Sequence, residues 1–325
     1  MSAFVGVDVS KATLDIVVLI DTKQTHQKIS NTPQEIATLI NWLDTFETIE
    51  CVCLEATGRY GDALAEALYL ADFCVSVENP LRIKSFAQSL LSRNKTDKYD
   101  AFVIALYAQR MRPDPWKPPS TAIKQLKQRT RLRHSLEQTR QSYRNRLKSG
   151  LDDEFTIELI QSFIQDLDSR IETLSKDIIN FIKQDAYLNQ QRKLIISIPG
   201  LADKTASVLL AEIGDIDKFD SPRALASYVG ITPKIRQSGS SVRGRTHISK
   251  QGNKRLRTAL YFPAISAKRW NPICRDFAHI LEQGGLAKKA ITIAVMRKLL
   301  HQVYGILKSQ HPFDPHFQQK IKIAT

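Results

Sequence analysis

The chain has 325 residues, a length that allows two domains and a connector. Its hydrophobic content of 42% and charged content of 25% are ordinary for a water-soluble globular protein, but its formal net charge of +14 is not. Such a charge favours a polyanionic partner, with nucleic acid before an anionic membrane. No apolar run reaches the ~18 residues of a membrane span, and the first residues lack the basic region of a signal peptide. We therefore expect a cytoplasmic protein with no membrane partner.

The four cysteines show no CxxC or Cys/His spacing of the kind that binds zinc. Cys51, Cys53 and Cys74 lie in apolar, strand-like runs, and Cys274 stands alone in the second half. We expect all four to be reduced residues of the core.

The N-terminal third predicts alternating strands and helices. Thr32, Pro33 and Glu35 have the residue types of a helix N-cap, a first helical position and a capping partner. The expected strands are 3–9, 14–20, 24–30, 50–55 and 73–78, and the expected helices begin near 33, 60 and 101. The order β-β-β-α-β-α-β-α is that of the RNase H/RuvC fold, a mixed sheet with helices on both faces.

Four acidic residues stand where two strands end and one helix begins. Asp8 ends the apolar run 4–7, and Glu55 ends the run 51–54. Asp97 and Asp100 lie three apart, just before the predicted helix, so one helix face can carry both. A cluster of four carboxylates repels itself unless divalent cations fill it, and such ligands suit Mg²⁺ or Mn²⁺. The pattern predicts a metal-dependent nuclease site.

A basic helix is predicted over roughly 120–149, after the proline-rich break 113–119. Its nine cations face a single acid, Glu137, which favours binding to phosphates over a merely solvated charged face. The cations are Lys124, Lys127, Arg129, Arg131, Arg133, Arg140, Arg144, Arg146 and Lys148.

Residues 151–190 are acidic and carry apolar residues at spacings of three and four, which predicts a coiled-coil-like or helical-hairpin arm. The arm could dimerise or pack on its own domain, and the pattern leaves both open. We expect three parts: a catalytic domain with the basic helix at 1–150, the arm at 151–190, and a mostly α-helical domain at 191–325.

The second half contains two candidate phosphate-binding segments. Residues 198–210 resemble a helix-hairpin-helix, although an ordinary helix pair in the core fits equally well. A loop rich in serine and glycine, 232–245, follows. Its flanking and following cations include Lys234, Arg236, Arg243, Arg245, Lys254, Arg255 and Arg257. A serine hydroxyl there could attack a phosphodiester, but composition alone favours a loop that only binds phosphate.

Six motifs in order resemble one known family. They are Gly6-Val7-Asp8-Val9-Ser10-Lys11, Leu54-Glu55-Ala56-Thr57-Gly58, Asn79-Pro80, Asn94-Lys95-Thr96-Asp97-Lys98-Tyr99-Asp100-Ala101, Ile198-Pro199-Gly200 and Ser238-Gly239-Ser240-Ser241-Val242-Arg243-Gly244. Together they resemble the DEDD-type transposases of the insertion-sequence-110 family, a group that includes pilin-gene invertases and bridge-RNA-guided recombinases. The resemblance covers nearly the whole chain.

The resemblance implies a RuvC-like catalytic domain, a helical arm and a C-terminal transposase domain. It makes Asp8, Glu55, Asp97 and Asp100 the metal ligands for two Mg²⁺ ions, with Mn²⁺ as a substitute, and Ser238 the nucleophile, with Ser240 and Ser241 as alternatives. The implied partners are donor and target double-stranded DNA, a structured noncoding guide RNA, and further copies of the chain in a dimer or tetramer at the prokaryotic nucleoid.

Three other functions compete with this one. A RuvC-type endonuclease or junction resolvase needs the four carboxylates and not the serine. An actin-like ATPase needs a glycine-rich adenosine loop, for which Val229-Gly230 and Gly284-Gly285 are too sparse. An RNA-binding protein derived from a transposase would not need the carboxylates and the serine.

Overall fold

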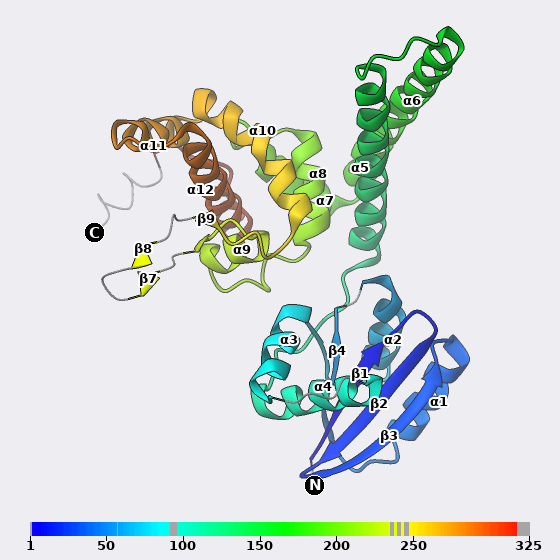
Figure 1. Cartoon of the computed structure of the whole chain (residues 1–325). Coiled ribbons are helices and arrows are strands. Elements are labelled where there is room, and N and C mark those ends of the chain that lie inside the picture. The colour runs from blue at the N-terminus through cyan, green and yellow to red at the C-terminus, as the bar shows by residue number, and fades with distance from the viewer. Residues whose placement is uncertain are drawn as a thin grey trace. The chain divides into compact units, whose positions relative to one another are not determined.

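The computed structural model describes residues 2–56, 58–91, 96–234, 237–238, 242–243 and 247–316. The side chains of Arg59 and of the two short segments 237–238 and 242–243 lie outside this description. The chain forms two compact units, Met1–Pro118 and Pro119–Thr325 (Figure 1). Each unit has its own core.

The first unit is built on a five-stranded mixed sheet (Figure 1). Its strands are β1 (Ala3–Val9), β2 (Thr13–Ile20), β3 (Lys23–Ser30), β4 (Ile49–Glu55) and β5 (Val75–Glu78). They lie in the order β3-β2-β1-β4-β5, with β1–β2 and β2–β3 antiparallel and β1–β4 and β4–β5 parallel. This is the mixed sheet that the sequence predicts for an RNase H-like domain.

Helices cover both faces of the sheet. The helices of this unit are α1 (Pro33–Leu43), α2 (Arg59–Leu70), α3 (Pro80–Ser89) and α4 (Asp97–Met111). Val5 and Val7 point to one face, where they pack with residues of α1 and α2. The alternate residues of β1 point to the other face, which α4 covers and where Ala101 and Ala105 join the apolar cluster of β2. Successive residues of β1 thus point to opposite faces of the sheet, and Asp8 lies on the face that α4 covers.

Side-chain caps explain where the helices begin. Thr32 accepts a hydrogen bond from the backbone N–H of Glu35, and Pro33 takes the first position of α1, as predicted. Thr96 caps α4 in the same way by accepting from the N–H of Tyr99 at 3.2 Å. Helix α4 therefore starts at Asp97, earlier than the predicted 101, and both Asp97 and Asp100 lie at its N-terminal end.

The cysteine prediction holds for three residues and fails for one. Cys51, Cys53 and Cys274 are free and buried, and burial raises the pKa of the Cys51 thiol to about 12. Cys74 is free but exposed, because it precedes β5 instead of lying within the sheet.

The second unit is mostly helical. Its helices are α5 (Thr121–Leu147), α6 (Glu154–Gln184), α7 (Ala186–Ile196), α8 (Asp203–Ile213), α9 (Pro222–Val229), α10 (Lys254–Trp270), α11 (Pro272–Gln283) and α12 (Lys288–Ser309). Four strands of two residues each, β6 (Pro233–Lys234), β7 (Gln237–Ser238), β8 (Val242–Arg243) and β9 (His247–Ile248), lie between α9 and α10.

Helices α5 and α6 lie side by side as an antiparallel hairpin (Figure 1). The apolar seam of α6 buries Ile178 and Ile182 in one cluster with Ile123 and Leu126 of α5. The basic helix therefore belongs by its contacts to the second unit. The sequence predicts three parts, whereas the structure forms two compact units, so the three-part division stays a prediction. Within the described ranges, no helix is long and apolar enough to cross a bilayer.

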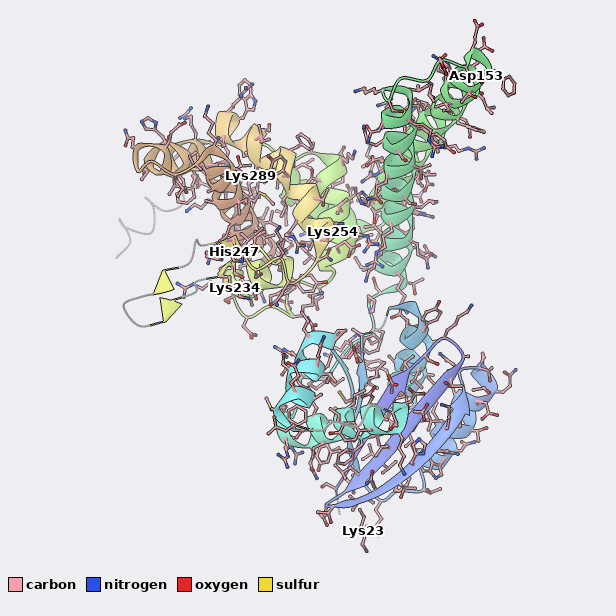
Figure 2. All side chains as sticks on the ribbon, viewed as in Figure 1. Lys23, Asp153, Lys234, His247, Lys254 and Lys289 are labelled. Carbon is pink, nitrogen blue, oxygen red and sulfur yellow. The ribbon has the colours of Figure 1, made fainter. Side chains whose placement is uncertain are left out.

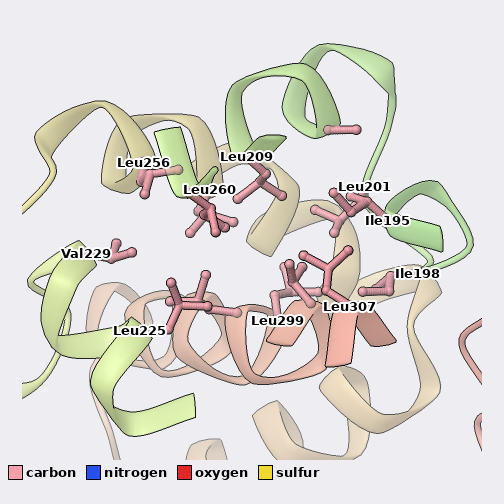
Figure 3. Packing of buried hydrophobic residues seen from close by; sticks show 14 of the residues in the cluster. Ile195, Ile198, Leu201, Leu209, Leu225, Val229, Leu256, Leu260, Leu299 and Leu307 are labelled. Atoms are coloured by element: carbon pink, nitrogen blue, oxygen red, sulfur yellow. The ribbon is translucent and has the colours of Figure 1, made fainter. Parts of the chain in front are cut away.

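The core of the second unit joins α7 to α10 and α12. Leu209 of α8, Leu260 of α10 and Leu299 of α12 are buried together (Figure 3). The turn between α7 and α8 packs into the same core, because a Cβ at Gly200 would lie 2.9 Å from the backbone nitrogen of Ala267. The predicted helix-hairpin-helix is thus a helix pair whose turn faces the protein interior.

Candidate active site

The four predicted carboxylates lie at one end of the sheet in the first unit. Strands β1 and β4 are parallel neighbours, with Val7 opposite Leu54, so Asp8 and Glu55 extend from the same edge. Helix α4 crosses this face with its backbone directly over β1, since a Cβ on Gly6 would lie 2.2 Å from the Ala101 carbonyl oxygen. This close approach places the first turn of α4 beside the end of β1.

The pKa values show that these carboxylates influence one another. Burial raises the pKa of Asp8 to about 6, and the negative charges of Asp100, Asp97 and Glu55 contribute to that rise in that order. Burial and the charge of Asp100 also raise the pKa of Glu55. The structure therefore brings all four acids into one electrostatic cluster, although they come from three separate segments of the chain.

Three further residues of this face, Asp15, His26 and Lys28, were not predicted. Asp8, Asp15 and Lys28 are direct cross-strand neighbours on β1, β2 and β3. Asp15 is only 4% exposed, and its two carboxylate oxygens lie 3.0 Å from His26 Nε2 and 3.0 Å from Lys28 Nζ. The same Lys28 ammonium lies 3.3 Å from Asp97. Strand alternation across the predicted hairpin would have found this row.

Glu78 adds another acid, beside Glu55. The two residues are direct partners in the parallel pair of β4 and β5, and Glu78 is 8% exposed. Arg82 lies 3.5 Å from the Glu78 carboxylate, and the backbone N–H of Asn79 donates to it at 3.3 Å. Glu78 thus has a compensating cation of its own.

The donor set fits a hard divalent cation. Carboxylate oxygens are the ligands that Mg²⁺ and Mn²⁺ prefer, and a cation would relieve the repulsion that raises the pKa of Asp8. Across the described ranges, no three His, Cys, Asp or Glu side chains already stand in the arrangement of a metal site.

The predicted serine loop has a defined base in the second unit. Strands β6 and β9 pair antiparallel, with Lys234 opposite His247 (Figure 2). Beyond that base, the backbone of Ser238 pairs with that of Val242. The Ser238 and Arg243 side chains, and the whole of Arg236, Ser240, Ser241 and Arg245, lie outside the described residues.

Several cations predicted to bind nucleic acid hold α5 to its neighbours. Arg129 lies 3.4 Å from Asp177 and over the ring of Phe181. Arg140 and Arg144 both pair with Asp168 of α6. Much of the positive charge of α5 is therefore used in ion pairs with α6.

The remaining cations lie around α8 and α10. Arg131 pairs with the buried Glu212, and Arg133 is itself only 3% exposed. Arg257 donates to the backbone carbonyl oxygens of Val229 and Gly252. The exposed residues at the start of α10 are Lys254, labelled in Figure 2, and Arg255. Lys124 and Lys127 each have an interaction partner.

Comparison with known proteins identifies the family. A model of DEDD transposases of the IS110 type matches residues 5–156, and the model described as Transposase IS116/IS110/IS902 family matches residues 192–279. The pilin gene-inverting protein of Moraxella bovis is 34% identical over 331 residues, covering 97% of this chain and 99% of that protein. The protein of the same name from Moraxella lacunata has the same identity and coverage.

Two more distant similarities cover parts of the chain. An uncharacterized 43.6 kDa protein of insertion element IS110 from Streptomyces coelicolor is 25% identical over 132 residues, 41% of this chain and 32% of that protein. The structure of T. thermophilus RuvC in complex with Holliday junction substrate covers 35% of this chain and 98% of its own at 20% identity, with a TM-score of 0.27. That TM-score is too low to carry an argument, so the fold assignment rests on the strand order.

The full-length relatives and the two family models agree with the resemblance drawn from the motifs. The DEDD match also suggests dependence on a divalent metal. The chain belongs to the IS116/IS110/IS902 family of transposases, and it is therefore an enzyme that cuts and rejoins DNA.

Proposed function

We propose that this transposase cuts and rejoins phosphodiester bonds of donor and target DNA with two sets of groups, a carboxylate cluster and a serine. Asp8, Glu55, Asp97 and Asp100 hold two divalent cations, and Ser238 is the nucleophile. The observation that carries the first half is the pKa of Asp8, which burial and the charges of four other carboxylates, the last of them Asp15, together raise to about 6. A carboxylate cluster under such repulsion is what a site for divalent cations needs.

The carboxylates of the cluster would serve as ligands for the metal ions. Bound Mg²⁺ or Mn²⁺ ions would polarise the scissile phosphate and neutralise its developing charge. Asp8 and Glu55 lie on strands β1 and β4, whereas Asp97 and Asp100 lie in the first turn of α4. Lys28 lies 3.3 Å from the Asp97 carboxylate and supplies part of its compensating charge. The chain thus supplies two ligands from neighbouring strands and two from one helix.

The serine step conserves phosphodiester bonds. The Ser238 Oγ atom forms a bond to phosphorus while one P–O bond to deoxyribose breaks, and the departing deoxyribose oxygen takes up a proton. In the second step, a hydroxyl of the other DNA partner attacks the phosphoserine and releases Ser238 with its proton. Two transesterifications therefore exchange strands without ATP.

The relatives support rejoining over cutting alone. Two relatives at 34% identity are named for inverting a pilin gene, an operation in which both DNA ends are joined again. The net charge of +14 supports a nucleic-acid partner but does not distinguish RNA from DNA. The structured guide RNA, the dimer or tetramer and the location at the nucleoid rest on the family resemblance.

The serine chemistry can be tested on plasmid DNA that carries the element's own gene with its flanks. With Mg²⁺, the wild-type protein should give a covalent protein–DNA adduct and recombined product. Ser238→Ala should give neither, while Ser240→Ala and Ser241→Ala should retain both. If Ser238→Ala still cuts and no adduct forms with the wild type, the chain acts as a RuvC-type endonuclease or resolvase instead.

The guide can be tested separately by sequencing nucleic acid that copurifies with the protein. A discrete RNA that maps beside the gene supports guidance. Random fragments contradict it and leave the serine chemistry unaffected.

A further inference from the structure

A groove of about 510 Å³ lies within the second unit, between α5, α8 and α10. Leu209 of α8 and Leu256 and Leu260 of α10 are buried in one cluster, which packs two of the groove's helices together (Figure 3). The groove is open to solvent and belongs to neither the carboxylate cluster nor the serine loop. Its charged and aromatic lining residues are Arg131, Arg133, His134, Glu137, Arg140, Lys204, Glu212, Arg255 and Phe262.

The charges in the groove do not balance. Glu212 neutralises Arg131, and Glu137 lies 2.7 Å from Lys204. Asp168 of α6 pairs with Arg140. Among the described residues, no carboxylate pairs with the guanidinium group of Arg255, and Arg133 shares the negative charge of Glu137 with Lys204.

Arg133 lies at the bottom of the groove. It is 3% exposed, and burial lowers its pKa. Its Nη2 atom donates to Ser207 Oγ at 3.2 Å and to the Lys204 carbonyl oxygen at 3.3 Å, both neutral acceptors. The Glu137 carboxylate, which Lys204 shares, offsets this burial only in part, so the Arg133 guanidinium adds to the positive potential of the groove.

The start of α10 strengthens that potential. Its first turn contains Lys254, Arg255 and Arg257 and no acid. The dipole of a helix is positive at this end, so cations there are electrostatically unfavourable and acids are the usual choice. Arg255 lines the groove, which therefore has an anion-binding end.

An exposed aromatic ring forms the other end of the α10 wall. Phe262 lies two helical turns from Arg255 and is 76% exposed. The adjacent Tyr261 ring contacts it at a centroid distance of 5.6 Å. A ring left in solvent beside a cationic groove offers a face on which a nucleobase can stack.

The groove is small. Its volume lies in the range of sites that enclose one small ligand, roughly 300–1,000 Å³. This is enough for one or two unpaired nucleotides and far too little for a duplex. Neutral hydrogen-bonding groups, such as those of Gln138, Gln141 and Thr258, complete the lining.

We propose that this groove binds a segment of single-stranded nucleic acid, with a phosphate at Arg255 and a base stacked on Phe262. The inference deepens the proposed function, because strand exchange and RNA guidance both require unpaired nucleotides. The unpaired segment has two sources, a displaced DNA strand and an RNA loop, which share the chemistry that the groove recognises.

The test measures binding without cleavage. Full-length protein carrying Asp8→Asn, freed of copurifying nucleic acid and kept in EDTA, is titrated into fluorescent oligonucleotides of about 12 nucleotides, followed by anisotropy. Oligo-dT and oligo-U represent the two sources, and a hairpin duplex of equal charge represents paired DNA. Phe262→Ala should weaken single-strand binding about tenfold and change duplex binding less than about twofold.

Arg255→Gln supplies an independent readout. It should weaken single-strand binding and reduce the slope of log affinity against log salt by roughly 0.7, the value for one phosphate contact on a single strand. The matched controls are Phe155→Ala on α6, whose ring is 71% exposed, and Arg275→Gln on α11. Both control variants should bind like the parent.

The outcomes separate cleanly. Tighter binding of oligo-U identifies RNA as the source, and tighter binding of oligo-dT identifies DNA. If Phe262→Ala and Arg255→Gln bind single strands as the parent does, or lose duplex binding equally, the groove is not a single-strand site. Loss of the serine adduct in the earlier experiment would leave this binding result unchanged, so the two proposals fail independently.

Discussion

The Nζ atom of Lys28 lies 3.3 Å from the carboxylate of Asp97, so β3 supplies a cation to the first turn of α4. The same ammonium lies 3.0 Å from Asp15, a buried neighbour of Asp8. Hydrogen bonds to Asp15 and Asp97, in that order, raise the pKa of Lys28. Lys28 therefore offsets part of the negative charge that a divalent cation would otherwise offset.

Replacing Lys28 by glutamine should strengthen metal binding. The variant removes a positive charge close to the proposed ligands, so the affinity for Mn²⁺ should rise about fivefold. Calorimetric titration of the full chain measures this without any DNA. Lys23→Gln, at the exposed start of β3, is the matched control and should bind Mn²⁺ as the wild type does. Unchanged or weaker binding by Lys28→Gln would show that Lys28 does not compete with the metal.

Metal-free protein should become less stable as the pH rises from about 4 to above 6. The pKa of Asp8 is about 6 in the folded chain and 3.8 as its ordinary value, so the folded state binds more protons in this window. The stabilising contribution of protonated Asp8 is complete below the lower value and is lost as the pH rises through the higher one.

Asp8→Asn should remove this dependence. Above pH 6 the variant should be more stable than the wild type by roughly 1–2 kcal/mol, a figure discounted for solvent screening. Urea unfolding in EDTA at pH 5 and pH 7.5 measures the difference, with the exposed Asp114→Asn as control. A variant that is less stable than the wild type at pH 7.5 would contradict the repulsion among the carboxylates.

Gly6→Ala should separate α4 from the sheet. The added methyl group would lie 2.2 Å from both the Ala101 carbonyl oxygen and the Ala105 nitrogen, and neither backbone atom can move alone. We expect a loss of about 3 kcal/mol in stability, together with weaker Mn²⁺ binding because Asp97 and Asp100 shift with the helix. Thermal unfolding and the calorimetric titration report the two effects.

Gly305→Ala is the control for that substitution. Gly305 lies in α12, and a methyl group added there would have nothing within 4 Å, so alanine should stabilise the helix by about 0.5–1 kcal/mol. Equal effects of the two substitutions would show that the contact between β1 and α4 is not tight.

Arg131→Ala should destabilise the second unit through Glu212. The Glu212 side chain is 2% exposed and receives hydrogen bonds from Arg131 at 2.8 and 3.1 Å and from Asn253 at 2.8 Å. Removing the guanidinium leaves a buried carboxylate without its cation, which costs about 3 kcal/mol. Arg170→Ala removes an exposed pair with Asp166 and should change the stability far less than Arg131→Ala does.

The same pair should give an acid-sensitive contribution. Burial alone would raise the pKa of Glu212, but the hydrogen bonds from Arg131 and Asn253 outweigh it and the pKa lies below its ordinary value of 4.5. The resulting stabilisation is present above that value and is lost as the pH falls through the folded pKa. Arg131→Ala should therefore flatten the acid limb of a stability profile measured by circular dichroism. An acid limb as steep as that of the wild type would rule this pair out as its cause.

The strand positions and the carboxylates at their ends could be predicted because each depends only on residues that are neighbours in the sequence. Apolar, β-branched runs placed β1 at its observed bounds and β2 within one residue. Asp8 and Glu55 were predicted because each is the polar residue that ends an apolar run. Helix α3 was missed, although Asn79 followed by Pro80 is a capping signal that the structure confirms.

The partners of charged residues did not follow, since they depend on register and on tertiary packing. Asp15 lay inside a predicted strand, but its contact with Lys28 requires the alignment of β2 with β3. The nine cations of the basic helix could be counted but not assigned. Arg140 pairs with α6 and Arg131 with α8, and sequence spacing contains no information on either contact.

The contact of Gly6 with α4 limits how this enzyme can be redesigned. At that point two backbones touch with no side chain between them, so the seam has no adjustable volume. Attempts to alter metal preference by repacking beneath the ligands will meet this barrier. Variation in this region has to enter through the connecting segments, such as the turn at residues 10–12, where polypeptide can be lengthened or exchanged while the supporting scaffold stays as it is.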